Sequence, residues 1–221
     1  MAYDLEEQEQ LASLQAFWNK YGNILMGVLI VVLLGYLGYT YYKYDQTQKA
    51  AGASTLFMTM QTAIDAKDNA LVQRTAGDIQ TRFKSTAYAQ MSALAAAKSA
   101  FDAADLKTAK AQLQWVVANG TEEYQSIAKL RLAGVLLDEK AYDEAMKVLS
   151  TPFMKEFAGS VADRKGDVLV AQNKVAEARS AYLAALEAMG KKGPGRILVE
   201  MKLEAIGGTV PKDADAPKAA A

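Results

Sequence analysis

Residues 106–113 read Leu-Lys-Thr-Ala-Lys-Ala-Gln-Leu, and this pattern of a large residue, an alanine and a second large residue occurs twice more. The later copies are residues 142–149 and 175–182. Their shared alanines, Ala109, Ala145 and Ala178, lie 36 and 33 residues apart. Upstream of each copy a small residue stands at the matching place: Ala97, Ala133 and Gly166. Spacings of three and four put these residues on one helix face, so the pattern predicts three pairs of helices.

A period near 34 residues is typical of tetratricopeptide repeats, in which helix pairs stack into a superhelical solenoid. Small residues let the two helices of a pair cross closely, while large ones fill the space between pairs. We therefore predict that six residues are repeat-packing positions: Ala97, Ala109, Ala133, Ala145, Gly166 and Ala178. Residues 69–83, with Ala76 and Ile79, are expected to be half of an earlier, more worn unit. Most Trp and Pro positions of the repeat consensus are absent, so an irregular alanine-rich helical bundle remains an alternative.

Beyond residue 43 the chain is rich in alanine and polar helix formers and has no extended β-branched alternation, which predicts an all-α domain over residues 43–207. Helices of roughly ten to eighteen residues are expected between polar breaks. These breaks lie near residues 66–69, 84–86, 102–105, 119–121, 138–140, 150–152, 172–174 and 191–195. Thr121 is placed to cap the helix that follows it. Residues 208–221 offer too little apolar surface to bury, so we expect a disordered tail there.

An apolar stretch precedes the repeats, with no charged residue in the 22 positions between Lys20 and Lys43. As a helix, 22 residues rise about 33 Å, close to the roughly 30 Å of a bilayer's hydrocarbon core. Aromatic residues mark both ends, as is typical at membrane interfaces. The sequence therefore predicts one N-terminal transmembrane helix over residues 21–42, preceded by a short, acidic, amphipathic segment over residues 1–20 in contact with membrane lipid.

Two alternatives to a membrane anchor remain, a buried core helix and a cleaved signal peptide. Ala51-Gly52-Ala53 has the form of a cleavage site, but the apolar run is longer than a signal peptide's and the segment before it is acidic. Lys43 and Lys49 follow the span and only Lys20 precedes it, so flank charge favours a cytoplasmic C-terminal domain by one residue.

The span has one smooth face on which another transmembrane helix could pack. Gly27, Val31, Gly35 and Gly38 fall within about 80° of arc on a helix that turns 100° per residue. Small residues let helix backbones approach closely in a membrane, which makes these four residues a possible partner-packing face.

Composition excludes most catalytic chemistry. The chain has 25 Lys and Arg against 25 Asp and Glu, and contains neither His nor Cys. The usual general base, thiolate nucleophiles and the commonest metal ligands are therefore missing. With balanced charge, the sequence shows no excess of basic residues of the kind that nucleic-acid binding requires. We expect no catalytic, cofactor-binding or metal residues and no small-molecule substrate, with a Ser/Lys dyad or a membrane-tethered enzyme as the remaining catalytic alternatives.

The order of these parts carries a family resemblance. Residues 17–22 read Phe-Trp-Asn-Lys-Tyr-Gly, the span ends in Gly-Tyr-Thr-Tyr-Tyr at 38–42, and alanine-rich helix pairs follow. Further similar strings are Ala-Lys-Ala-Gln-Leu-Gln at 109–114 and Ala-Asp-Arg-Lys-Gly-Asp at 162–167. Over roughly residues 5–206 the chain resembles the YfgM family of Gram-negative bacteria.

The resemblance implies a non-catalytic, single-pass inner-membrane protein with a cytoplasmic N-terminus and periplasmic repeats. It also implies association with the SecYEG translocon and with the membrane-anchored periplasmic chaperone PpiD. The periplasmic placement conflicts with the flank charges. Two other functions stay open, a repeat adaptor for another envelope assembly and a sequestering regulator of a signalling protein.

Overall fold

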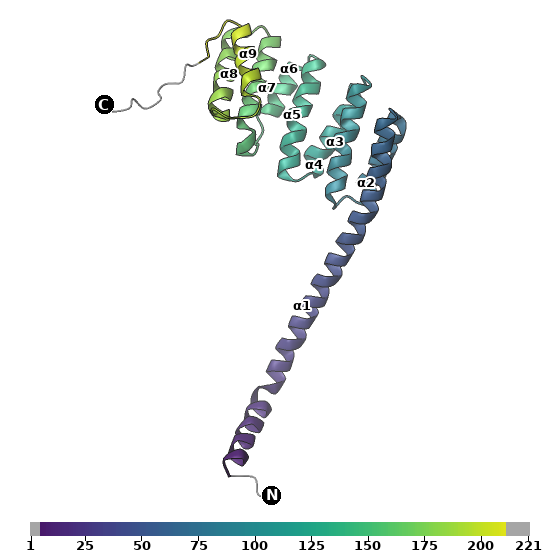
Figure 1. Ribbon diagram of the computed structural model, residues 1–221, viewed down its shortest axis with the longest axis vertical. Helices are drawn as coiled ribbons and strands as arrows, with labels where there is room; N and C mark the ends of the chain where they lie inside the picture. Colours follow the sequence, from purple (N-terminus) through teal and green to yellow (C-terminus); the bar gives the residue numbers. More distant parts are fainter. Residues whose placement is uncertain (1–4, 211–221) are drawn as a thin grey trace, which may run out of the picture. The chain divides into compact units, whose positions relative to one another are not determined.

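The computed structural model describes residues 5–210, and within these residues it contains helices and no strand (Figure 1). This confirms the predicted all-α fold. The helices are α1 Leu5–Asp65, α2 Asn69–Arg82, α3 Ala87–Asp102, α4 Leu106–Asn119, α5 Glu122–Asp138, α6 Tyr142–Leu149, α7 Ala158–Ala171, α8 Val175–Met189 and α9 Arg196–Ala205, with a 3-10 turn η1 at Lys155–Phe157. All eight predicted breaks coincide with the ends of helices, although α6 is shorter than expected.

Helix α1 is 61 residues long and includes the whole predicted span. It holds no proline, the residue that would remove a backbone hydrogen bond from the interior of a helix. Every large apolar side chain from Leu11 to Tyr44 is exposed. Among the described residues, α1 is the one helix long and apolar enough to cross a membrane. This agrees with a single N-terminal transmembrane helix, whereas a core helix would be covered by protein.

The chain divides into two compact units, residues 1–52 and 53–221. In the second unit each helix packs against the next, with α3 on α4, α5 on α6 and α7 on α8 as the pairs. Adjacent residues of one helix belong to neighbouring apolar clusters: Ala96 faces α1 and α2, and Ala97 faces α4 and α5. On α7, the adjacent residues Val168 and Leu169 also belong to two different apolar clusters. The core therefore continues from pair to pair, as in a solenoid.

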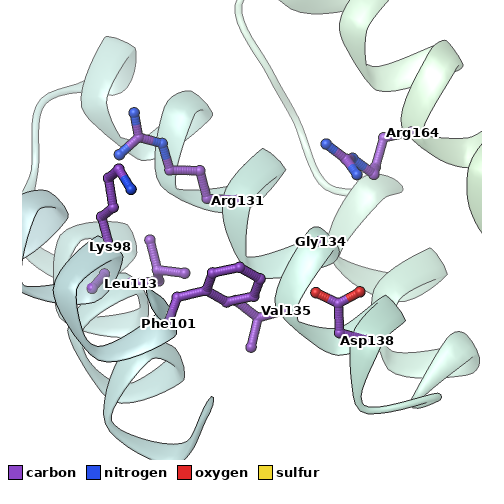
Figure 2. A pocket seen from close by; sticks show the side chains of 9 residues that line it. Lys98, Phe101, Leu113, Arg131, Gly134, Val135, Asp138 and Arg164 are labelled. Atoms are coloured by element: carbon purple, nitrogen blue, oxygen red, sulfur yellow. The ribbon is translucent and has the colours of Figure 1, made fainter. Parts of the chain in front are cut away.

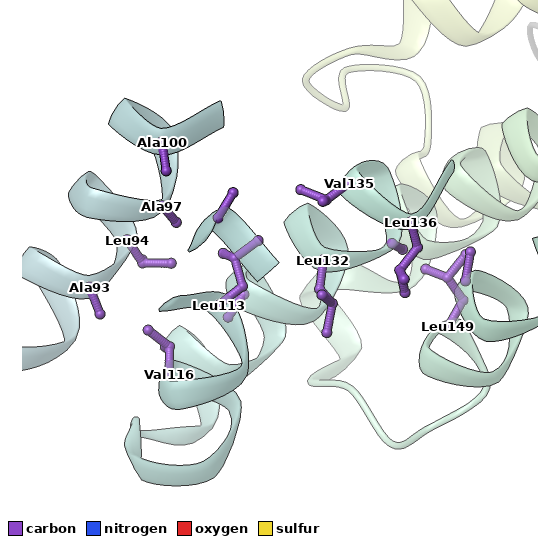
Figure 3. Close-up of a cluster of buried hydrophobic side chains, with 14 of the residues drawn as sticks. Ala93, Leu94, Ala97, Ala100, Leu113, Val116, Leu132, Val135, Leu136 and Leu149 are labelled. Carbon is purple, nitrogen blue, oxygen red and sulfur yellow. The ribbon is translucent and has the colours of Figure 1, made fainter. Parts of the chain in front are cut away.

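The pairs α3–α4 and α5–α6 bury leucines between their two helices. Figure 3 shows Leu94 of α3 beside Leu113 of α4, and Leu136 of α5 beside Leu149 of α6. All four side chains are at least nine-tenths buried. Burying a leucine contributes about 1.5–3 kcal/mol, so these contacts stabilise the stack more than helix propensity does.

The turn inside each pair has the same backbone geometry. One residue with φ near +60° occurs in every such turn: Lys67, Ala104, Lys140 and Asn173. The amide of the next residue then donates to the carbonyl five residues back, for example Asp105 N to Ala100 O at 2.9 Å. This is the Schellman ending of a helix, which usually uses glycine because a left-handed residue without a side chain is unstrained.

The first of these turns joins α1 to α2, so residues 53–65 of α1 are the partner of α2. Met60 and Ala63 of α1 are buried with Ala76 and Ile79 of α2. Residues 69–83 are thus the second half of a complete first unit, and the first half is continuous with the apolar helix.

Two local predictions differ from the structure. Thr121 does precede α5, but its side chain makes no capping hydrogen bond. Its backbone amide instead donates to Gln90 Oε1 at 2.8 Å. The expected tail begins at residue 208, yet Gly208 N donates to Leu203 O at 2.9 Å and Val210 packs against the last apolar cluster. The rest of that tail, residues 211–221, and residues 1–4 of the acidic segment lie outside the described residues.

Candidate interaction surfaces

The six predicted repeat-packing positions lie inside the second unit. Ala97, Ala133 and Gly166 come from the first helix of each pair, and Ala109, Ala145 and Ala178 come from the second. The five alanines are at most 3% exposed, and Gly166 is also buried. Their role in repeat packing remains a prediction of the register.

Gly166 is the tightest of these positions. A Cβ atom built there would overlap the ring of Tyr182, which crosses from α8. Tyr182 is 3% exposed and its hydroxyl donates to Asp167 Oδ1 at 2.9 Å. The glycine therefore makes room for an aromatic ring where the other pairs place leucine.

The predicted transmembrane face is open along its length. A Cβ atom added at Gly27, Gly35 or Gly38 would meet nothing within 4 Å, and Val31 is 69% exposed. The residues share one side of a continuous helix. Their packing against another helix remains a proposal.

A groove of about 280 Å³ lies on the side of the stack formed by the first helices of the pairs, α3, α5 and α7. Its floor is apolar and includes Ala97, Leu113 and Val135. The ring of Phe101 stands in the groove and is 41% exposed. Figure 2 shows Lys98 and Arg131 pointing to one end, with Asp138 and Arg164 on the other side of that ring.

The cations of this groove differ in how they are paired. Lys98 Nζ lies 2.6 Å from Asp102 Oδ2, in an exposed pair along one helix. Arg164 is 3.6 Å from Asp167. Within residues 5–210, the Arg131 guanidinium makes neither an ion pair nor a hydrogen bond. Arg131 therefore keeps its hydrogen-bond donors for solvent or a ligand.

An ionic cluster joins α9 to α7. Lys202 Nζ donates to Asp163 Oδ1 at 2.8 Å and lies 2.7 Å from Asp167 Oδ1. Desolvation raises the pKa of the Asp163 carboxyl, although its bond to Lys202 opposes that change. Burial, and the nearby charge of Asp167, raise the pKa of Tyr182 well above its usual value. One lysine thus holds two half-buried carboxylates, which fixes the terminal helix.

No group of three His, Cys, Asp or Glu residues in residues 5–210 is arranged to hold a metal ion. Asp163 and Asp167, the two carboxylates of the ionic cluster, both pair with Lys202. The absence of cofactors and catalytic residues remains a prediction.

Sequence reasoning missed the groove and the ionic cluster. The repeat register contained a signal for the groove, since Arg131 and Arg164 both stand two positions before a small residue of the first helix. Equivalent positions in stacked repeats share one face. Lys202 lies outside the three repeats, so no comparable signal pointed to it.

Comparison with known proteins gives a consistent result. Residues 15–208 match the family described as "Tetratricopeptide repeat-like domain". A Neisseria gonorrhoeae protein named "Ancillary SecYEG translocon subunit" is 36% identical over 208 residues, covering 93% of this chain and 100% of the relative. Proteins of the same name from Escherichia coli and Haemophilus influenzae are 28% and 27% identical, each over 82% of this chain and over 87% and 89% of their own lengths. No solved structure matches the chain.

Proposed function

Because the chain belongs to the YfgM family of ancillary SecYEG translocon subunits, we propose that it is a non-catalytic, single-pass subunit of a SecYEG translocon in the bacterial inner membrane. The observation that carries the proposal is the 36% identity over the full length of a relative with that name. The division of the chain into an apolar helix and a repeat domain suits such a role. One part locates the protein in a membrane, and the other offers a large surface for protein partners.

The proposed mechanism is scaffolding. The span would hold the repeats beside the channel exit, where tethering raises the effective concentration of a partner without any new contact. In this proposal the N-terminus is cytoplasmic, the repeats are periplasmic, and they hold the chaperone PpiD for handover of translocated proteins. The order of the chain supports this mechanism, since the apolar segment comes directly before the helix pairs of the repeat domain.

Purification of the tagged full-length protein from membranes in mild detergent tests the partners. Bound proteins would be identified by mass spectrometry, with the translocon and the chaperone as the expected result. Recovery of neither would contradict the proposal, and recovery of another envelope complex would favour the adaptor alternative.

The contribution of the span can be tested on its smooth face. Gly35→Leu with Gly38→Leu fills this face and keeps the helix apolar, so membrane insertion should persist while translocon recovery falls. Val32→Leu with Tyr36→Leu is the matched control, since both positions lie off the face on the helical wheel. Equal loss in both variants, or loss in neither, would argue against this face.

One observation favours a second candidate function. Lys43 and Lys49 after the span, against Lys20 before it, would place the repeats in the cytoplasm, where they could sequester a signalling protein. Protease added to intact spheroplasts separates the two placements. Digestion of the repeats with cytoplasmic markers intact supports the translocon proposal, and protection until lysis supports the regulator.

A further inference from the structure

We propose that the groove between α3, α5 and α7 binds an extended peptide in which an acidic side chain lies next to an apolar one. This inference goes beyond the proposed function, because it names the chemistry that the groove selects whichever protein supplies the peptide.

The acidic preference follows from Arg131 and Lys98. Their side chains come from different helices and point to the same end of the groove (Figure 2). Arg131 has no anionic partner in residues 5–210, and its planar guanidinium can hold a carboxylate with two parallel hydrogen bonds. The bond from Lys98 to Asp102 joins side chains that are 69% and 57% exposed, so it contributes little stability and can be exchanged for a ligand.

The apolar preference follows from the middle of the groove. Phe101 leaves a large part of its ring uncovered above a floor that includes Ala97 and Val135. An apolar side chain of the peptide would cover this ring, and aromatic residues in such pockets often dominate binding. A carboxylate beside Arg131 then puts the neighbouring side chain within reach of Phe101.

The far end of the groove sets the direction of the peptide. Asp138 lines that end and would repel a second carboxylate placed near it, although Arg164 lies close by. A ligand bound only by positive charge, such as a nucleic acid, would bring phosphates to both ends. The charge pattern therefore favours a peptide with its acidic residue at the Arg131 end.

The test uses the full-length protein in detergent micelles and fluorescence anisotropy of a short labelled peptide in which Asp alternates with Phe and Leu. We expect saturable binding that weakens with added salt. Arg131→Gln should weaken binding about tenfold, as should replacing Asp by Asn in the peptide. Arg74→Gln, which removes an exposed guanidinium from α2, is the matched control and should leave binding unchanged. Phe101→Ala should also weaken binding.

Several outcomes would overturn the inference. These are equal binding by Arg131→Gln or by Phe101→Ala, equal binding of the Asn peptide, and equally tight binding of a single-stranded oligonucleotide. Thermal melting of each variant establishes that it is folded. Translocon recovery with Arg131→Gln is measured in parallel, so a failure of the groove is distinguishable from a failure of the proposed function.

Discussion

The two units of the chain use apolar residues in opposite ways. Residues 7–52 expose almost every side chain, including the large apolar side chains from Leu11 to Tyr44. From Ala53 onward the helices bury small residues against leucine and tyrosine, and leave charged residues outside. An apolar helix with no polar face needs a lipid environment, whereas an amphipathic helix needs only a neighbouring helix. Helices of the two units are therefore suited to different surroundings, lipid for the first unit and neighbouring helices and water for the second.

Charged residues in the span should have the largest effect. Leu29→Lys with Leu33→Lys is expected to prevent stable insertion, because each Lys costs about 2.5–3.5 kcal/mol at the centre of a membrane helix. Alkaline extraction of membranes would then release the protein. Met58→Lys is the control in the same helix, since Met58 is 69% exposed and belongs to the second unit. If the double variant stayed in the membrane pellet, the span would be misplaced.

Overpacking a buried alanine should have the next largest effect. Ala178→Leu adds volume where the side chain is fully buried, and should lower the free energy of unfolding by about 1–3 kcal/mol. Ala184→Leu lies in the same helix at an exposed position and should change it little. Urea unfolding of the full-length protein in detergent, followed by circular dichroism, measures both. Similar values for the two variants would mean that the repeat register is wrong.

Removing the lysine of the ionic cluster should have a smaller effect. Lys202→Met leaves Asp163 and Asp167 half-buried without their shared cation, which should cost about 1–2 kcal/mol. Lys98→Met breaks an ion pair of similar length that is exposed, so its cost should be at most a few tenths of a kcal/mol. Equal melting of the two variants would show that α9 is not held by this cluster.

The turns allow a stabilising change. Ala104 has φ of 59°, which is strained for a residue with a side chain. Ala104→Gly should raise the free energy of unfolding by about 0.5–1 kcal/mol. Ala103→Gly is the control one residue earlier, where φ is −88°, and should lower it because glycine adds freedom to the unfolded chain. Destabilisation by both variants would contradict the shared turn geometry.

The smallest effect concerns pH. Hydrogen bonds from Thr108 lower the pKa of Asp105, so its contribution to stability is present above the unfolded value near 3.8 and is lost as the pH falls through the folded value. Asp163 has a raised pKa, so the folded protein keeps the proton of this carboxyl at a higher pH than the unfolded chain does. Its contribution to stability is therefore present below the unfolded value near 3.8 and is lost as the pH rises through the folded value.

The two pKa shifts therefore predict opposite changes in stability with pH. Relative to wild type, Asp105→Asn should lose less stability on acidification below about pH 4, and Asp163→Asn should gain less stability when the pH is lowered toward about 4. Unfolding midpoints across this pH range measure both slopes. Parallel curves for the two variants would contradict the assignments.

Local sequence predicted the span and indicated most of the helix boundaries. An uncharged run such as 21–42 favours insertion into lipid whatever follows it, and the polar breaks end helices through their own turn chemistry. The spacing of Ala109, Ala145 and Ala178 also indicated the helix pairs, since repeats make the same contact at each step. These properties depend on neighbours within a few residues or on a fixed period.

Tertiary structure decided which side chains meet. Lys98 and Arg131 are separated by two turns and a helix, and only the stacking of α3 on α5 directs them into one groove. Lys202 reaches Asp163 and Asp167 because α9 packs back on the last pair, a contact outside the repeat period. Contacts between distant residues depend on how whole helices pack, and single-residue preferences carry no information about that packing.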